Sequence, residues 1–259
     1  MPTERRNKIL SIIDQYGDVS LSFLCDLFPD VSSMTIRRDL IYLEEKGLVI
    51  RTQGGVKSVK MLSGGVVSPS YDENEYTFRA QQNVHAKQII AQKAAQFIKK
   101  NSSIFFDAGS TMMALAKILP NDYMNVISTG INVSQELVAH SNINVTIPGG
   151  SVNRATLSVS GSDSIAFIDK VNIECAFISA SAFSLDSGFS VSNMYEAELN
   201  RKVISKAKQT IVLLDSSKIG KSLLFTFADL SAIDVLVTDD EPLSPALIQA
   251  AKLAGTVII

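Results

Sequence analysis

Short apolar segments alternate with amphipathic segments along the chain from about residue 85 onward. The stretch "SIFFDAGS", residues 103–110, has the composition of a buried strand that ends in a polar turn, and the stretches on either side of it have helical spacing of their apolar residues. Further strands are expected near residues 126–128, 145–147, 176–179, 211–214 and 235–238. Because apolar strands separated by helices pair in parallel and are covered on both faces, this alternation predicts an α/β domain with a mostly parallel sheet.

The first 60 residues follow a different pattern. Helices are expected over residues 4–16, 20–28 and 32–46. Ser32 is placed to cap the third helix and Gly47 to end it. The next stretch, "LVIRTQGGVKSV", predicts two short strands joined at a Gly-Gly pair. Three helices followed by a two-stranded wing predict a winged helix-turn-helix domain.

Residues 61–77 show neither the helical nor the strand spacing of apolar residues, and they contain Gly-Gly, Ser and Pro. This composition is typical of a linker. A chain of 259 residues is long enough for one small and one medium domain. We therefore expect a winged helix-turn-helix domain over residues 1–60, a linker over 61–77 and an α/β domain over 78–259.

Composition excludes several classes of protein. The net charge is −2, and the first 60 residues carry nine Lys and Arg against eight Asp and Glu, so any DNA contact must come from where single charges lie. Cys25 and Cys175 sit in apolar patterns and are expected to be free thiols, and the two histidines are too few for a metal cluster, so we expect neither metal nor cofactor. With no apolar run of about 18 residues and no signal-peptide core at the start, we expect a cytoplasmic protein.

Two adjacent arginines, Arg37 and Arg38, lie in the middle of the third predicted helix. At about 100° per residue, Ile36, Leu40 and Leu43 form the core stripe. Arg38 lies about 200° from Ile36, opposite that stripe, and Arg37 lies on its flank. An arginine pair on a helix is usually a solvated face, but the short helix before it and the glycine wing after it favour DNA recognition, with Arg38 in the groove and Arg37 on phosphate. The predicted DNA contacts are Ser32, Ser33, Met34, Thr35, Arg37, Arg38, Tyr42, Arg51, Gln53, Gly54 and Gly55.

Four loops of the second domain are rich in Gly, Ser, Thr and Asp, and each follows a predicted strand: 107–111, 128–130, 148–156 and 215–222. In open α/β sheets ligands bind at the carboxyl ends of the strands. Ser110 and Thr111 would open a helix, whose amides suit a phosphate, and Lys218 would supply a positive charge. Asp and Ser also cap helices for structural reasons alone, but four such loops at one edge predict a site for a small, anionic, polyhydroxylated ligand.

The stretch "VSSMTIRRDLIYLEEKGLVIRTQGG", residues 31–55, resembles the signature of the DeoR family of bacterial transcriptional repressors, which carries "TIRRDL" on its recognition helix and a Gly-Gly wing. The four loops resemble the family's sensor domain, which is similar in fold to ribose-5-phosphate isomerase. The resemblance covers residues 4–57 and 78–240. It implies repression of a carbohydrate-utilisation operon that is relieved by a phosphorylated sugar. It also implies effector contacts at Asp107, Gly109, Ser110, Thr111, Ser128, Thr129, Gly149, Gly150, Asp215 and Lys218.

The chain departs from the family pattern at four positions. Gln53 stands where the family often has histidine, and Asn200 where many members have lysine. Ser179 and Ser181 stand where members often carry glycine. These differences bear on the wing's DNA contact and on the identity of the effector, and they leave the expected architecture unchanged.

Other functions stay open at this point. An isomerase or lyase acting on sugar phosphates would need a general base, for which Asp107, Glu196, Glu198 and Asp215 are candidates, but the sequence shows no pair with opposed roles. A third hypothesis is that the N-terminal helices serve only for contacts with other proteins. The predicted outward position of the arginine pair disfavours it. The expected partners are double-stranded operator DNA, a phosphorylated sugar and further copies of the chain in a dimer or tetramer, with no membrane.

Overall fold

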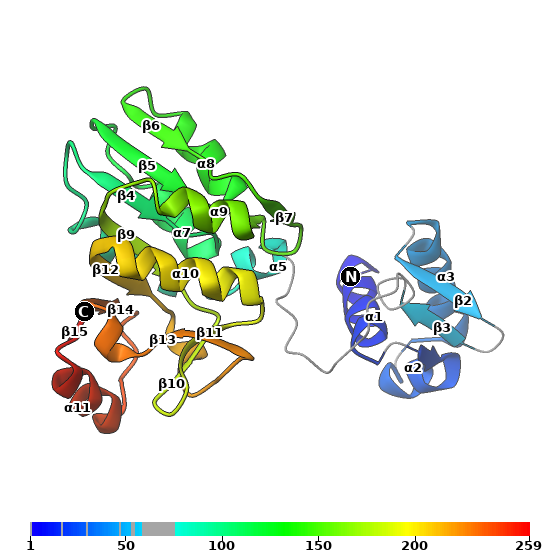
Figure 1. Ribbon diagram of the computed structural model, residues 1–259. Helices are drawn as coiled ribbons and strands as arrows, with labels where there is room; N and C mark the ends of the chain where they lie inside the picture. Colours follow the sequence, from blue (N-terminus) through cyan, green and yellow to red (C-terminus); the bar gives the residue numbers. More distant parts are fainter. Residues whose placement is uncertain (1, 17, 30, 47, 53–54, 59–75) are drawn as a thin grey trace. The chain divides into compact units, whose positions relative to one another are not determined.

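A computed structural model describes residues 2–16, 18–29, 31–46, 48–52, 55–58 and 76–259. The chain divides into two compact units, Met1–Asp72 and Glu73–Ile259 (Figure 1). Gly47, Gln53, Gly54 and most of the expected linker, residues 61–75, lie outside the described residues. Each unit is described by itself below.

The N-terminal unit is a small helical domain with an antiparallel sheet. Its elements are α1 (Pro2–Tyr16), β1 (Asp18–Ser20), α2 (Leu21–Leu27), α3 (Ser33–Glu45), β2 (Val49–Thr52) and β3 (Gly55–Ser58). Ser20 and Ser32 cap α2 and α3 by accepting hydrogen bonds from backbone amides three residues later. The three helices and the wing confirm the predicted winged helix-turn-helix. Strand β1, which pairs with β3, was not predicted, because three residues are too few to show an alternating pattern.

A buried carboxylate joins α1 to α3. Asp39 is 1% exposed and accepts hydrogen bonds from Arg5 Nε at 2.6 Å and Arg6 Nε at 2.7 Å. Burial opposes ionisation of Asp39, but the hydrogen bonds and charges of the two arginines outweigh it and hold the pKa of Asp39 below its ordinary value. The acidic residue of the "IRRD" motif is therefore buried and holds α1 against α3, whereas the two arginines before it in the motif are exposed.

The C-terminal unit is built on a seven-stranded parallel sheet, in the order β15-β14-β12-β9-β4-β5-β6. In chain order these strands are β4 (Ser103–Phe106), β5 (Met124–Ser128), β6 (Ile143–Thr146), β9 (Ile173–Ser179), β12 (Ala207–Leu213), β14 (Val235–Val237) and β15 (Val257–Ile258). The helices are α5 (Tyr76–Gln81), α6 (Val84–Ala95), α7 (Ser110–Ala116), α8 (Ile131–Val138), α9 (Ser162–Ile168), α10 (Met194–Lys206) and α11 (Pro245–Ala254). The predicted α/β fold class with a mostly parallel sheet is confirmed.

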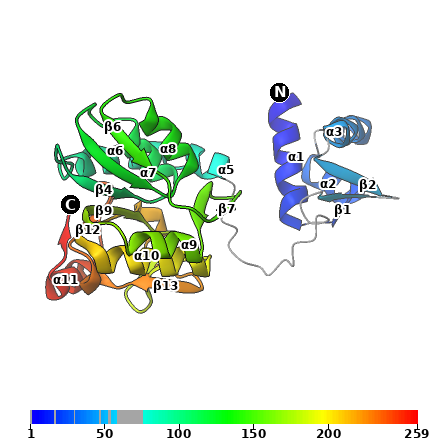
Figure 2. The same cartoon turned by 45° about the horizontal axis from the view of Figure 1, so that its top comes forward.

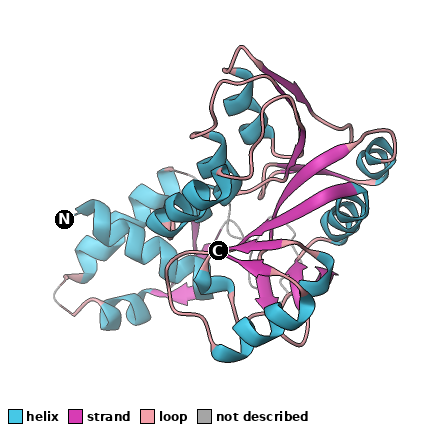
Figure 3. Ribbon diagram, turned by 90° about the vertical axis from the view of Figure 1, so that its left-hand side faces the viewer, coloured by secondary structure: helices cyan, strands magenta, loops and turns pink. Residues whose placement is uncertain are grey.

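Helices cover both faces of the sheet (Figure 3). Helices α6, α7 and α8 lie on one side, and α9 and α10 on the other (Figure 2). Strand β4 divides its side chains between the two layers, because successive residues of a strand point to opposite faces. Ile104 and Phe106 pack with α6 and α7 in one core, and Phe105 packs in the other. This double burial explains why the strands read as continuous apolar runs.

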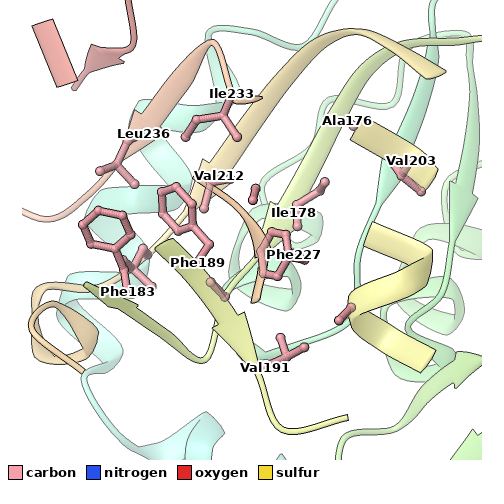
Figure 4. Close-up of a cluster of buried hydrophobic side chains, with 14 of the residues drawn as sticks. Ala176, Ile178, Phe183, Phe189, Val191, Val203, Val212, Phe227, Ile233 and Leu236 are labelled. Carbon is pink, nitrogen blue, oxygen red and sulfur yellow. The ribbon is translucent and has the colours of Figure 1, made fainter. Parts of the chain in front are cut away.

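Two small antiparallel sheets flank the main one, and neither was predicted. Strands β7 (Ser151–Asn153) and β8 (Ser158–Ser160) form a ribbon, and β10 (Ala182–Ser184), β11 (Gly188–Val191) and β13 (Phe225–Ala228) form a three-stranded sheet. Phe189 lies between Phe183 and Phe227, at 4.5 and 6.2 Å between ring centroids. These rings join the core that Val212 and Leu236 of the main sheet also line (Figure 4).

Both cysteines are free thiols, as predicted, and burial raises the pKa of Cys175 to about 12. In the part of the chain that the structure describes, no helix is long and apolar enough to cross a bilayer.

Candidate functional sites

The outer face of α3 is the candidate DNA-binding surface. Ile36, Leu40 and Leu43 are buried, as the helical positions predict. Arg37 and Arg38 are exposed, and neither has an ion-pair partner among the residues that the structure describes. Ser32, Ser33 and Met34 are exposed at the start of the helix, and Met34 is 62% exposed. Thr35 is half-buried, and its hydroxyl lies 2.9 Å from that of Ser32. Two cations without ion-pair partners in the described residues, at the N-terminal end of an exposed helix face, have the arrangement of a recognition helix.

Three other predicted DNA contacts have structural partners within the unit. The Arg6 guanidinium lies 3.9 Å from the centre of the Tyr42 ring. Arg51 Nε is 2.6 Å from a carboxylate oxygen of Glu44. Gly55 lies so close to β1 that a Cβ would stand 2.6 Å from the Val19 carbonyl oxygen, so the strand pairing alone requires glycine there.

A polar pocket lies at the carboxyl ends of β4 and β9, which are neighbours in the sheet. Its lining comes from α5, the turn after β4, the segment between β7 and β8, the end of β9, β11 and α10. The lining residues are Arg79, Asp107, Ala108, Gly109, Thr156, Ser179, Ser181, Val191, Glu196 and Asn200. The position agrees with the general rule for ligand sites in open α/β sheets.

Asp107 organises the loops under the pocket. One carboxylate oxygen accepts from the Ser179 amide at 3.1 Å and the other from the Ala108 amide at 2.7 Å. Thr129 donates to the same carboxylate at 3.3 Å. Burial raises the pKa of Asp107 even though these hydrogen bonds favour the ionised form. Gly109 then opens α7 at a φ of 124°, a conformation that favours glycine.

A second carboxylate closes the other side of the pocket. Glu196, in the first turn of α10, accepts from the hydroxyls of Thr156 at 3.2 Å and Ser158 at 2.5 Å. Asn200 follows one helical turn later and also lines the pocket, although it is 2% exposed. The sequence pattern singled out Glu196 only as a candidate base and Asn200 only as a departure from the family.

Arg79 is the pocket residue that sequence reasoning missed. Its side chain reaches the pocket from α5, and Nε and one terminal nitrogen are buried without a hydrogen-bond partner in the described residues. Leaving buried N–H groups without acceptors is costly, so this guanidinium is suited to an anion that enters the pocket. A lone arginine before an amphipathic helix has no sequence signature that would have identified it.

A cluster of charged residues lies close to the pocket without lining it. Lys218 Nζ is 3.4 Å from Asp215 and donates to the Ala180 carbonyl at 3.2 Å. Burial opposes ionisation of Asp215, but the charge of Lys218 and hydrogen bonds that include one from Asn83 hold its pKa below the ordinary value. Burial and the charge of Lys218 lower the pKa of Lys87 to about 8.

The remaining predicted effector residues do not line the pocket. Ser128 and Thr129 are buried beneath it, Thr111 is buried in α7, and Ser110 is half-buried at the start of that helix. Gly149 and Gly150 are exposed on another loop. Of the residues predicted as effector contacts, the structure thus brings Asp107 and Gly109 to the pocket and places the others behind or beside it. Glu198 and Asp215, two of the candidate bases, also stand outside it.

Comparison with known proteins decides the family. Residues 5–61 match the profile of the "DeoR-like helix-turn-helix domain", and residues 82–240 match that of the "DeoR C terminal sensor domain". The chain belongs to the DeoR family. One relative of this DeoR-family chain is the HTH-type transcriptional regulator GolR of Listeria innocua, 32% identical over 98% of this chain and 96% of the relative. Another is the glycerol-3-phosphate regulon repressor of Escherichia coli, 27% identical over 93% and 92% of the two chains.

Distantly related solved structures also resemble part of the chain. Ribose 5-phosphate isomerase A of Methanocaldococcus jannaschii is 17% identical, with a TM-score of 0.39 over 53% of this chain and 55% of that one. A likeness at this level carries no argument about activity. The full-length relatives are named transcriptional regulators, and this DeoR-family chain is a transcriptional regulator rather than an enzyme.

Proposed function

We propose that this regulator represses a carbohydrate-utilisation operon and leaves its operator when a phosphorylated sugar occupies the pocket beside Arg79. The observation that carries the proposal is that two nitrogens of the Arg79 guanidinium, Nε and one terminal nitrogen, are buried at the pocket without a hydrogen-bond partner among the described residues. A phosphate group would supply the missing acceptors in the two-pronged geometry that guanidinium groups favour.

The rest of the lining suits the sugar part of such a ligand. Asp107, Glu196 and Asn200 offer acceptors and donors for hydroxyl groups, and Thr156, Ser179 and Ser181 add hydroxyls of their own. Val191 gives one apolar wall. A relative whose name includes glycerol-3-phosphate also supports a phosphorylated polyol as the effector class. Among the predicted effector residues we therefore propose Asp107 and Gly109 as direct contacts, and Ser128, Thr129, Asp215 and Lys218 as supporting residues.

For DNA we propose that α3 enters the major groove of the operator. Arg38 would contact a base edge and Arg37 a phosphate, because both are exposed at the start of α3 and unpaired within the described residues. One such unit reads few bases, so a dimer or tetramer of the chain would present two or more units to repeated half-sites in cytoplasmic DNA.

A thermal-shift screen tests the effector proposal. Pentose and hexose phosphates are compared with the same sugars without phosphate, because a ligand that binds only the folded state raises its melting temperature. We expect a shift with at least one phosphorylated sugar, and none with its unphosphorylated form. Turnover of the sugar phosphate would point to an enzyme and contradict the proposal.

Arg79→Gln is the matching variant. It should retain operator binding and lose at least about 90% of its affinity for the sugar phosphate, since a charge-assisted bidentate contact is worth about 2 kcal/mol or more. Arg154→Gln, at an exposed position that does not line the pocket, serves as the control and should respond like the wild type. An Arg79→Gln protein that still leaves DNA at wild-type effector concentration would remove Arg79 from the site.

A further inference from the structure

Helix α5 is held from its carboxyl end by one side chain of α6. Lys87 is 5% exposed, and its ammonium group donates to the backbone carbonyls of Arg79 and Gln82. The last carbonyls of a helix lack partners within the helix, and a cation at that end also opposes the negative end of the helix dipole. Lys87 thus supplies what the end of α5 needs, from the neighbouring helix.

Helix α5 depends on hydrogen bonds from outside the helix because it is short. It spans six residues, fewer than an isolated helix needs to be stable in water. At its other end the amide of Tyr76 donates to the Ala155 carbonyl at 2.8 Å. The carbonyl of Arg79 is therefore held by Lys87, while the guanidinium of the same residue reaches the pocket.

The covalent order of the chain gives this arrangement a second consequence. Residues 59–75 join β3 of the DNA-binding unit to α5, so α5 is the first described element of the sensor unit that the connecting segment reaches. An anion that engages Arg79 acts on that element directly.

We propose that Lys87 is a positioning residue, which clamps α5 so that Arg79 faces the anion that enters the pocket. This rests on the proposed function of the pocket and deepens it. Lys87 does not contact the effector: it is not among the residues that line the pocket, and two of its three N–H bonds are directed to carbonyls.

Hydrogen–deuterium exchange of the full-length protein without ligand tests the clamp. Lys87→Met keeps a long, unbranched side chain, one atom shorter, and removes the donors, so the amides of residues 76–82 should exchange about tenfold faster than in the wild type. Lys93→Met is the matched control on the same helix, because Lys93 donates to the Thr238 carbonyl and pairs with Asp240 instead. It should leave the exchange rates of residues 76–82 unchanged.

Exchange in β4 and β9 serves as the internal reference for intact folding. Lys87→Gln, which keeps one donor group, should give an intermediate exchange rate in residues 76–82.

A second arm adds inorganic phosphate as the probe. In the wild type, phosphate should slow exchange in residues 76–82; Arg79→Gln should abolish that effect and Lys87→Met should reduce it. Unchanged exchange in free Lys87→Met overturns the clamp. Faster exchange in the free variant combined with full phosphate protection overturns the link from Lys87 to Arg79. If no sugar phosphate binds in the screen above, the proposed function fails, and the ligand-free comparison still decides the clamp.

Discussion

Asp39 links two helices through two guanidinium groups, so its charge should matter to the stability of the N-terminal unit. Asp39→Asn should lower the free energy of unfolding of that unit by about 2–4 kcal/mol, because it weakens two charge-assisted hydrogen bonds to a buried group. Urea titrations of the full chain, followed by the NMR methyl signals of Ile9 and Ile13, measure it. Asp26→Asn, at an exposed position of α2, should change the value by less than about 0.5 kcal/mol.

Because of the Asp39 carboxylate, the stability of the N-terminal unit should depend on pH. Its pKa in the folded protein is below the ordinary value of about 3.9, so the unfolded chain takes up the proton first as the pH falls. The stabilisation should be complete above about pH 5 and be lost as the pH falls through the folded pKa. The difference between wild type and Asp39→Asn should therefore shrink in acid. A difference that stays constant from pH 7 to pH 3 would contradict the assignment.

Substitution of Arg37 and substitution of Arg38 should affect DNA binding in different ways. Arg38→Ala should weaken operator binding by about 1–3 kcal/mol with little effect on nonspecific DNA, as expected for a contact with a base edge. Arg37→Ala should weaken both and reduce the slope of affinity against salt by about one charge. Fluorescence anisotropy over a range of salt concentrations separates the two, and effector affinity should be unchanged in both. Loss of effector binding in either variant would contradict the separation of the two units' functions.

At the scale of elements, the wing depends on a close approach between strands. Gly55→Ala would place a Cβ 2.6 Å from the Val19 carbonyl oxygen, which forces β1 and β3 apart. We expect a loss of about 1–3 kcal/mol in the N-terminal unit, measured by the same methyl signals. Gly149→Ala, where a Cβ meets nothing within 4 Å, should leave the melting temperature of the protein nearly unchanged.

Elements with a strong local pattern were predictable, and elements that depend on distant partners were not. The apolar run that becomes β4 and the core stripe of α3 are local patterns that extend over several residues. β1 and the hairpin of β10 and β11 have three or four residues each and exist because of partners elsewhere in the chain. Helix α5 begins at Tyr76, inside the segment expected as linker, because the carbonyl of Ala155 and the side chain of Lys87 hold it.

At the scale of the whole molecule, the proposal requires more than one DNA-binding unit in each particle. Multi-angle light scattering of the purified protein should give a mass of at least two chains of 28.0 kDa. Binding of sugar phosphate should lower operator affinity by about 5- to 150-fold, the usual range for coupling between sites. A monomer that binds its operator tightly would contradict the half-site arrangement.

The sequence by itself determined the two architectures and the exposed arginines of α3, because hydrophobic periodicity and helix caps are local properties of the chain. It also indicated the sheet edge at which the pocket lies, through Asp107 and Gly109. Only the tertiary structure decided which side chains meet there. Arg79 and Glu196 are more than a hundred residues apart, and both reach the pocket only because the parallel sheet brings the turn after β4 beside α5 and α10. Such long-range contacts leave no periodic trace in a single sequence.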